Sequence, residues 1–319
     1  MPERTLRPET ERDDRPSDSG EELLDGFERV IQLRARRGPR REANTAIPTE
    51  ICQLSDESRI VVHQDPRSAA ADRFKMMHIR LKELQAANNL KTILITSALP
   101  GDGKSTVALN LATVLAEKGR YPVLLLEADV YRPVLSKRLG VRPWGGLTQC
   151  YLRGTEPARA IRRIEPLGFY FLPAGEPARD ADRPLQSSFV ISMMNSLSAY
   201  EFGWILIDAP PTTPVADVLV LKAQADATLL VARAGATPVE SIEDSIRNLG
   251  REQVIGLVLN GVEGINRAYS RYYGYSAEEP VGRWERLKRF ARGIVAGKSP
   301  ERTASDGSQS RHDSSQRRR

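Results

Sequence analysis

The most chemically informative run lies at residues 98–106, which read Ala-Leu-Pro-Gly-Asp-Gly-Lys-Ser-Thr. Glycines let a backbone wrap closely around a phosphate, and the amide N–H groups at the start of a following helix point at the anion. Lys104 would neutralise the β- and γ-phosphates of a nucleoside triphosphate, and Ser105 would bind Mg²⁺. The strict pattern has glycine where this chain has Ala98, and a glycine-rich turn without a nucleotide is the alternative. The predicted nucleotide-binding residues are Gly101, Asp102, Gly103, Lys104, Ser105 and Thr106.

Acidic side chains follow two apolar runs that we expect to be strands. Glu127 and Asp129 come after the run 123–126, and Asp208 comes after the run 204–207. In an extended chain, Glu127 and Asp129 would project to the same side. Carboxylates that end strands beside a phosphate-binding loop are suited to holding Mg²⁺ or its waters. The predicted metal-binding residues are Ser105, Asp129 and Asp208.

A tyrosine cluster occupies residues 269–275, which read Tyr-Ser-Arg-Tyr-Tyr-Gly-Tyr. Its members are Tyr269, Tyr272, Tyr273 and Tyr275. The neighbouring Gly274, Ser276 and Glu278 favour a polar, mobile segment. An interfacial or core aromatic patch is the alternative, but a strand would bury alternate tyrosines and the stretch offers no apolar partners.

The elements that must position these residues alternate between strands and helices. Six short apolar runs are continuous, as expected of strands buried on both faces. The runs are 92–97, 123–126, 169–172, 204–207, 227–231 and 254–259. The clearest helical period between them covers Ser105–Lys118, with Gly119 just past its end. The pattern predicts an α/β fold of the P-loop NTPase type, with a mostly parallel, doubly wound sheet and helices on both faces.

On these motifs the chain resembles the bacterial tyrosine kinases (BY-kinases) of capsule and exopolysaccharide export, in their standalone cytoplasmic form. The resemblance covers roughly residues 65–276. The first phosphate-binding motif of the family matches Ala98–Thr106, and the second matches Leu126–Pro133. The third, an Asp followed by a Pro-Pro pair, matches Ile207–Pro211, and the tyrosine cluster follows the last strand as in the family.

The resemblance implies an ATP- and Mg²⁺-dependent kinase that phosphorylates its own tyrosine cluster, typically on a neighbouring subunit of a ring. It also implies a membrane-bound partner involved in polysaccharide chain-length control, which supplies an activating segment. Lys104 and the loop would hold ATP, Ser105 and Asp208 would position Mg²⁺, and Asp129 with Glu127 would orient the phenol. Asn260 resembles the residue that reads adenine in the superfamily.

The chain departs from the family pattern at three places, one of which is the tyrosine cluster, which lies some 44 residues from the C-terminus instead of near it. Glu127 stands where the family has Asp, and a displacement of ~1 Å at a catalytic group can cost ~10²-fold in rate. The helix motif associated with ring assembly is degenerate, as Asp72, Lys75 and His78 occupy its three positions. These departures bear on kinase activity and ring formation and leave the ATP-binding motif unchanged.

Charge and composition suggest how the chain is organised. Residues 281–319 hold 11 Lys/Arg against four Asp/Glu, so the basic excess of the chain lies in this tail. Nucleic-acid binding over the folded surface is therefore not expected. We predict a disordered or linker segment with one short amphipathic helix over 1–50, the P-loop kinase domain over 51–265, the tyrosine cluster over 266–280 and a largely disordered basic tail over 281–319.

Both ends of the sequence bear on where the protein acts in the cell. The N-terminus lacks the apolar core of a signal peptide, which favours a cytoplasmic protein. The stretch 281–295 combines apolar residues at helical spacing with Arg and Lys, so it suits either peripheral contact with an anionic membrane or packing on the domain.

Two other functions remain open. A scaffold that binds ATP without kinase activity is suggested by Glu127. A positioning ATPase of the ParA/MinD type is the other, although such proteins characteristically have lysine at the position of Leu99 and give no reason for clustered tyrosines.

Overall fold

The computed structural model describes residues 47–118, 121–142, 144–177, 185–213 and 217–262. The tyrosine cluster, the basic tail and the amphipathic helix predicted within residues 1–50 lie outside the described residues. No helix in the described ranges has the length and apolar character that crossing a bilayer requires.

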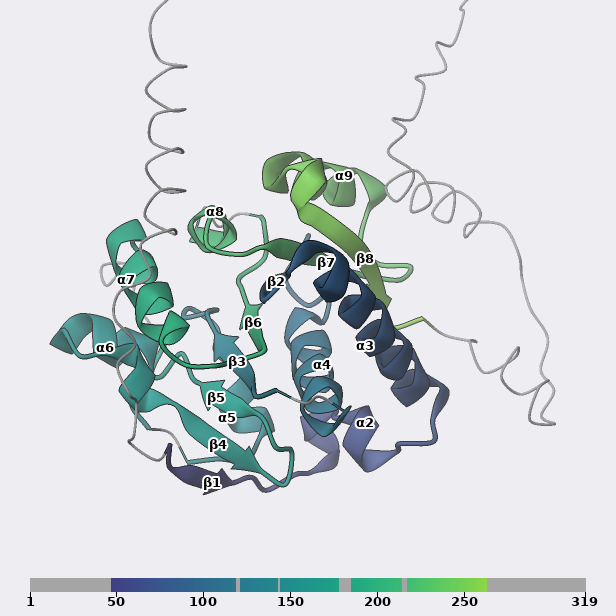
Figure 1. Ribbon diagram of the computed structural model, residues 1–319. Helices are drawn as coiled ribbons and strands as arrows, with labels where there is room; N and C mark the ends of the chain where they lie inside the picture. The colour runs from purple at the N-terminus through teal and green to yellow at the C-terminus, as the bar shows by residue number, and fades with distance from the viewer. Residues whose placement is uncertain (1–46, 119–120, 143, 178–184, 214–216, 263–319) are drawn as a thin grey trace, which may run out of the picture. The chain divides into compact units, whose positions relative to one another are not determined.

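Within these ranges, eight strands form a single sheet in the order β1-β4-β5-β3-β6-β2-β7-β8 (Figure 1). Neighbouring strands run parallel except for β4 and β5, which pair antiparallel. The strands are β1 (Thr49–Ile51), β2 (Thr92–Ser97), β3 (Val123–Glu127), β4 (Arg162–Glu165), β5 (Tyr170–Leu172), β6 (Trp204–Asp208), β7 (Ala227–Arg233) and β8 (Val254–Asn260). The predicted α/β class with a mostly parallel sheet is confirmed. The short strands β1 and β4 have no counterpart in the sequence-based prediction.

Helices cover both faces of the sheet (Figure 1). Helices α2 to α5 contribute buried residues to one apolar core, and α6 to α9 contribute to a second. The helices are α2 (Val61–Gln64), α3 (Ala69–Asn88), α4 (Lys104–Lys118), α5 (Leu135–Arg138), α6 (Leu147–Arg153), α7 (Ser187–Ser198), α8 (Asp217–Lys222) and α9 (Val239–Leu249), with short 3-10 turns η1 (Asp56–Ser58), η2 (Pro157–Ala160) and η3 (Arg251–Gln253). The doubly wound arrangement is therefore as predicted.

The continuous apolar runs are explained by this double cover. In β2, Ile93 and Ile95 pack in the core on the α4 side, while Leu94 between them packs in the core on the other side. All three side chains are fully buried. Burying each such side chain contributes about 1.5–3 kcal/mol, so the central strands anchor the loops that follow them.

The site lies where the central strands end. The loop after β2 reaches α4 through Gly101 and Gly103, whose φ angles of 89° and 101° fall in the region that glycine adopts without penalty. In the neighbouring strands β3 and β6, Glu127 lies in register beside Asp208. Since the carboxyl ends of parallel strands meet at one edge of a sheet, the fold brings the phosphate-binding loop and the acidic residues together.

Candidate nucleotide-binding site

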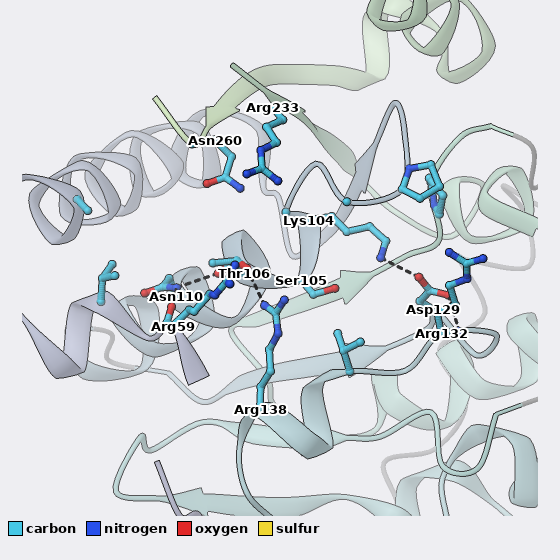
Figure 2. Close-up of a pocket in the computed structure, with 18 of the residues that line it drawn as sticks. Arg59, Lys104, Ser105, Thr106, Asn110, Asp129, Arg132, Arg138, Arg233 and Asn260 are labelled. Carbon is cyan, nitrogen blue, oxygen red and sulfur yellow. Dashed lines mark hydrogen bonds and ion pairs between the residues drawn. The ribbon is translucent and has the colours of Figure 1, made fainter. Parts of the chain in front are cut away.

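A cavity of about 960 Å³ opens at this edge of the sheet, a volume within the range of small-molecule sites (Figure 2). The loop before α4, the segment after β3 and the end of β8 border it, together with the segment that carries η1, α2 and the start of α3. The predicted residues that line it are Gly101, Gly103, Lys104, Ser105, Thr106, Asp129 and Asn260. The other three described members of the predicted set, Asp102, Glu127 and Asp208, are buried outside its lining.

Lys104 forms an ion pair in the wall of the cavity (Figure 2). Its Nζ lies 2.7 Å from Oδ2 of Asp129, and the two side chains are 13% and 7% exposed. Burial alone would lower the pKa of Lys104, but the carboxylates of Asp208 and Asp129 outweigh it, so the pKa lies above its usual value. The second oxygen of Asp129 accepts the N–H of Arg132 at 3.1 Å. A charged ammonium and an oriented carboxylate therefore face the same space.

Asp208 is the strongest candidate for a metal ligand. Its side chain is 1% exposed, and neither carboxylate oxygen has a hydrogen-bond partner among the described residues. Burial raises the pKa of Asp208 to about 6, although the charge of Lys104 and the nearby hydroxyl of Ser105 act in the opposite direction. A buried carboxylate without partners is costly, so a cation beside Ser105 would complete the site.

The donor set also fits Mg²⁺ rather than a metal caged by protein alone. The described residues contain no group of three or more His, Cys, Asp or Glu side chains able to hold an ion. Mg²⁺ usually keeps several waters and is bound through one or two carboxylates plus the phosphates of a substrate. Ser105 and Asp208 would supply the protein share of such a set.

Glu127 has a different environment from the one expected for it. Its Oε1 accepts the N–H groups of Val134 and Leu135 at 2.7 and 2.6 Å, and its Oε2 accepts that of Ala174 at 3.2 Å. The side chain is fully buried, and burial raises its pKa to about 7 despite these three hydrogen bonds. Glu127 thus fixes the start of α5 and the segment after β5. The carboxylate is fully engaged with the backbone, whereas Asp129 faces the cavity.

Asp102 and Asn260 shape the loop. Asp102 accepts the N–H of Leu99 at 2.9 Å and the hydroxyl of Thr237 at 2.7 Å. Asn260 Nδ2 donates to the Asp102 carbonyl at 2.9 Å. A Cβ on Gly103 would lie 1.8 Å from that same Nδ2, so this approach requires glycine. The predicted role of Asn260 in reading adenine stays a prediction, but its place on the cavity wall is compatible with it.

Four arginines that the sequence motifs did not predict also line the cavity, namely Arg59, Arg132, Arg138 and Arg233 (Figure 2). Arg132 lies within the second motif, so it could have been predicted as a site residue from the sequence. Arg138 lies five residues after the second motif, Arg59 and Arg233 come from elements far from any motif, and none of the three carried a signal of its own. Together with Lys104 the four arginines outnumber the carboxylates of the lining, which are Asp56, Asp65 and Asp129, so the wall carries a net positive charge that suits a polyanionic ligand.

Residues 88–262 of the chain match the protein family described as ParA, NUBPL iron-transfer P-loop NTPase. Over 247 residues the chain is 27% identical to the tyrosine-protein kinase YwqD of Bacillus subtilis (strain 168). This match covers 76% of the chain and 97% of YwqD. Over 234 residues it is 28% identical to the succinoglycan biosynthesis transport protein ExoP of Rhizobium meliloti (strain 1021), which covers 68% of this chain. The match spans 30% of ExoP, so the chain corresponds to less than a third of that protein.

Among solved structures, the kinase domain of the Escherichia coli tyrosine kinase ETK is similar, with a TM-score of 0.59 and 21% sequence identity. The match covers 79% of this chain and 91% of that domain. At this identity the likeness shows that the two share a fold.

Proposed function

Since this chain belongs to the ParA family of P-loop NTPases, we propose that it binds ATP with Mg²⁺ and transfers the γ-phosphate to tyrosine side chains. The acceptors are the four residues of its own tyrosine cluster, Tyr269, Tyr272, Tyr273 and Tyr275. Similarity to YwqD, which is named a tyrosine-protein kinase and is matched over nearly its whole length, favours this activity over that of a positioning ATPase.

The observation that carries the proposal is the pairing of Lys104 with Asp129 at 2.7 Å in the cavity wall. A lysine in a phosphate-binding loop binds phosphate as a cation, and a carboxylate that faces the same space can orient the attacking nucleophile. Asp129 faces that space and is held by the Arg132 N–H. It is therefore suited to receive and orient an incoming hydroxyl group.

In the proposed reaction, the amide groups of the loop and Lys104 bind and orient the phosphates of ATP. Mg²⁺, held by Ser105 and Asp208, would neutralise charge on the phosphate oxygens. Asp129 orients the phenol and accepts its proton as the tyrosine oxygen bonds to the γ-phosphorus. The bond from that phosphorus to the β-phosphate oxygen breaks, and ADP leaves with that oxygen. Glu127 contributes indirectly, by fixing the backbone on which α5 begins.

The biological setting is part of the proposal. Similarity to ExoP, named for succinoglycan biosynthesis and transport, suggests a role in the biosynthesis and export of capsule or exopolysaccharide. We propose a membrane-bound co-polymerase as activator, a ring of identical subunits in which one subunit modifies the next, and cytoplasmic action near the membrane. Peripheral membrane contact would come from the basic tail at 281–319.

A mixing experiment tests the activity and its transfer between subunits. One chain carries Lys104→Met and keeps its tyrosines, while the other keeps Lys104 and carries phenylalanine at all four cluster positions. Neither chain alone should gain phosphotyrosine with Mg-ATP, and the mixture should gain it on the Lys104→Met chain. The assay is run with and without the cytoplasmic segment of a candidate activator. ATP turnover without phosphotyrosine would favour a positioning ATPase, and ATP binding without turnover a scaffold.

A further inference from the structure

Two arginines converge on one side of the phosphate-binding loop, away from Lys104 (Figure 2). Arg138, the last residue of α5, donates from Nη1 to the hydroxyl of Thr106 at 2.6 Å. Arg59 follows η1 and lines the same part of the cavity. Burial lowers the pKa of Arg138, the carboxylates of Asp208 and Glu127 act in the opposite direction, and the positive charge of Arg59 lowers it. The two guanidinium groups are therefore close enough to repel each other.

Neither arginine forms an ion pair within the described ranges. The ion pairs there join Lys75 with Asp72, Arg80 with Glu83, Lys104 with Asp129, Arg163 with Glu165 and Arg247 with Asp244. Asp56 and Asp65 also line the cavity, but neither forms an ion pair with Arg59 or Arg138. Two adjacent cations on a partly enclosed wall cost free energy unless an anion binds between them.

The backbone holds this pair in place at some cost. Arg59 adopts φ 52° and ψ 39°, a left-handed conformation that costs a non-glycine residue roughly 1–2 kcal/mol. Its carbonyl accepts a hydrogen bond at 2.8 Å from the side chain of the fully buried Asn110. The same amide group donates to the Thr106 carbonyl at 2.9 Å, and Ser58 Oγ donates to the Arg138 carbonyl at 2.5 Å. Strained residues held by their surroundings are typical of binding sites.

We propose that Arg59 and Arg138 bind the α-phosphate of the nucleotide. The loop backbone cradles the α- and β-phosphates, while its lysine reaches the β- and γ-phosphates. Thr106 lies two residues beyond Lys104, and Arg138 is bonded to its hydroxyl, so the arginine pair lies at the α-phosphate side of the loop. Guanidinium groups suit this task because their N–H donors match the geometry of phosphate oxygens. The inference rests on the nucleotide site of the proposed function and makes no use of the kinase step.

The test measures the affinity of the full chain for AMP and ADP by calorimetry. Arg138→Met and Arg59→Met should each weaken ADP binding by about 10- to 100-fold, the usual effect of losing a hydrogen bond to a charged group. AMP carries only the α-phosphate, so its affinity should fall in both arginine variants and change little in Lys104→Met. Arg138→Lys should recover part of the loss, because it keeps the charge without the planar donor pair.

The matched control is Arg153→Met, an exposed arginine at the end of α6 that does not line the cavity. Melting temperature without nucleotide checks that each variant folds. If Arg138→Met fails to fold, Arg59→Met carries the test, since no described residue forms a hydrogen bond with the Arg59 side chain. ADP and AMP affinities unchanged within twofold in the arginine variants, with ADP binding lost in Lys104→Met, would overturn the inference and leave the nucleotide site standing. Unchanged nucleotide affinity with weakened phenyl phosphate binding would instead assign the pair to a phosphorylated tyrosine, which also overturns it.

Discussion

The two ends of the cavity bring opposite arrangements of charge to one phosphate-binding loop. At the Lys104 end, one cation is paired with Asp129 and lies near the buried carboxylate of Asp208. At the Arg138 end, Arg138 and Arg59 face the cavity with no carboxylate paired to either within the described ranges. An end that only holds a phosphate needs cations. In the proposed function, the Lys104 end must also hold a metal and receive a hydroxyl group, which requires carboxylates, so the proposal assigns binding to one end and chemistry to the other.

The largest effect is expected from Asp129→Asn, which removes the carboxylate paired with Lys104 and leaves the Arg138 end unchanged. Phosphotyrosine formation should fall by about 10²–10⁴-fold, the usual contribution of a positioned acid or base. ADP affinity should hold or improve, because Lys104 loses the carboxylate that competes for it. Quantitative phosphopeptide analysis and calorimetry on the same preparation measure both. Phosphorylation within threefold of the wild type would remove Asp129 from the chemistry.

Asp208→Asn should lower phosphorylation while raising the free energy of unfolding of the metal-free chain. Phosphorylation should fall by about 10²-fold and require more Mg²⁺, since the metal loses a charged ligand. Without metal, the free energy of unfolding at pH 8 should rise by about 1–2 kcal/mol, because the cost of burying this carboxylate exceeds what the charge of Lys104 returns. Urea unfolding in a chelator measures this, and a loss of stability of similar size would contradict the metal assignment.

Glu127→Gln tests the buried carboxylate that holds the backbone at the start of α5 and after β5. Glutamine has an NH₂ group where one carboxylate oxygen accepts a backbone N–H, so a buried donor such as that of Ala174 loses its partner. We expect a decrease of about 1–3 kcal/mol in the free energy of unfolding, with a smaller effect on phosphorylation than Asp129→Asn has. Glu127→Asp is the matched control, because it keeps the charge and shortens the reach. If Glu127→Gln were fully stable yet inactive, Glu127 would act directly in the chemistry.

The smallest effect is a dependence of stability on pH. The pKa values of Glu127 and Asp208 are raised to about 7 and about 6 in the folded chain, above those of the unfolded chain. The folded state then binds more protons, so stability is highest below the unfolded values and is lost as pH rises through 6 and 7. In a chelator, the free energy of unfolding should decline between pH 5 and pH 8, on the order of 1 kcal/mol or more. Asp208→Asn should make the decline shallower. A free energy of unfolding that rises over this range would contradict the raised pKa values of Glu127 and Asp208.

The sequence predicted those parts of the molecule whose contacts are local. The loop at residues 98–106 follows β2 and opens α4 directly, so one run of residues defines strand, loop and helix. The β4 strand was missed because Arg162–Glu165 has a single buried apolar residue, Ile164, and lies near the edge of the sheet. Its antiparallel pairing with β5 is likewise unmarked by any apolar pattern.

Geometry beyond the strand ends was harder to predict. The expectation that Glu127 and Asp129 share one side assumed an extended chain, but β3 ends at Glu127 and the N–H groups of Ala128 and Asp129 both donate to the Asp208 carbonyl. That turn gives the two acids different partners. The Arg138 end joins residues as distant as 59 and 110, whose contact depends on how α4 packs against the segment before α3. No local pattern encodes such a contact.

The central claim is that the Lys104 end transfers phosphate to tyrosine, and intact-mass spectrometry after incubation with Mg-ATP tests it most directly. The wild-type chain and Lys104→Met are incubated with and without the activating segment of a membrane partner, and the products are mapped by digestion. We predict phosphate additions to Tyr269, Tyr272, Tyr273 or Tyr275 in the wild type and none in the variant. A wild-type chain that binds ATP and the partner but gains no phosphate would contradict the account, as would equal phosphorylation of both chains.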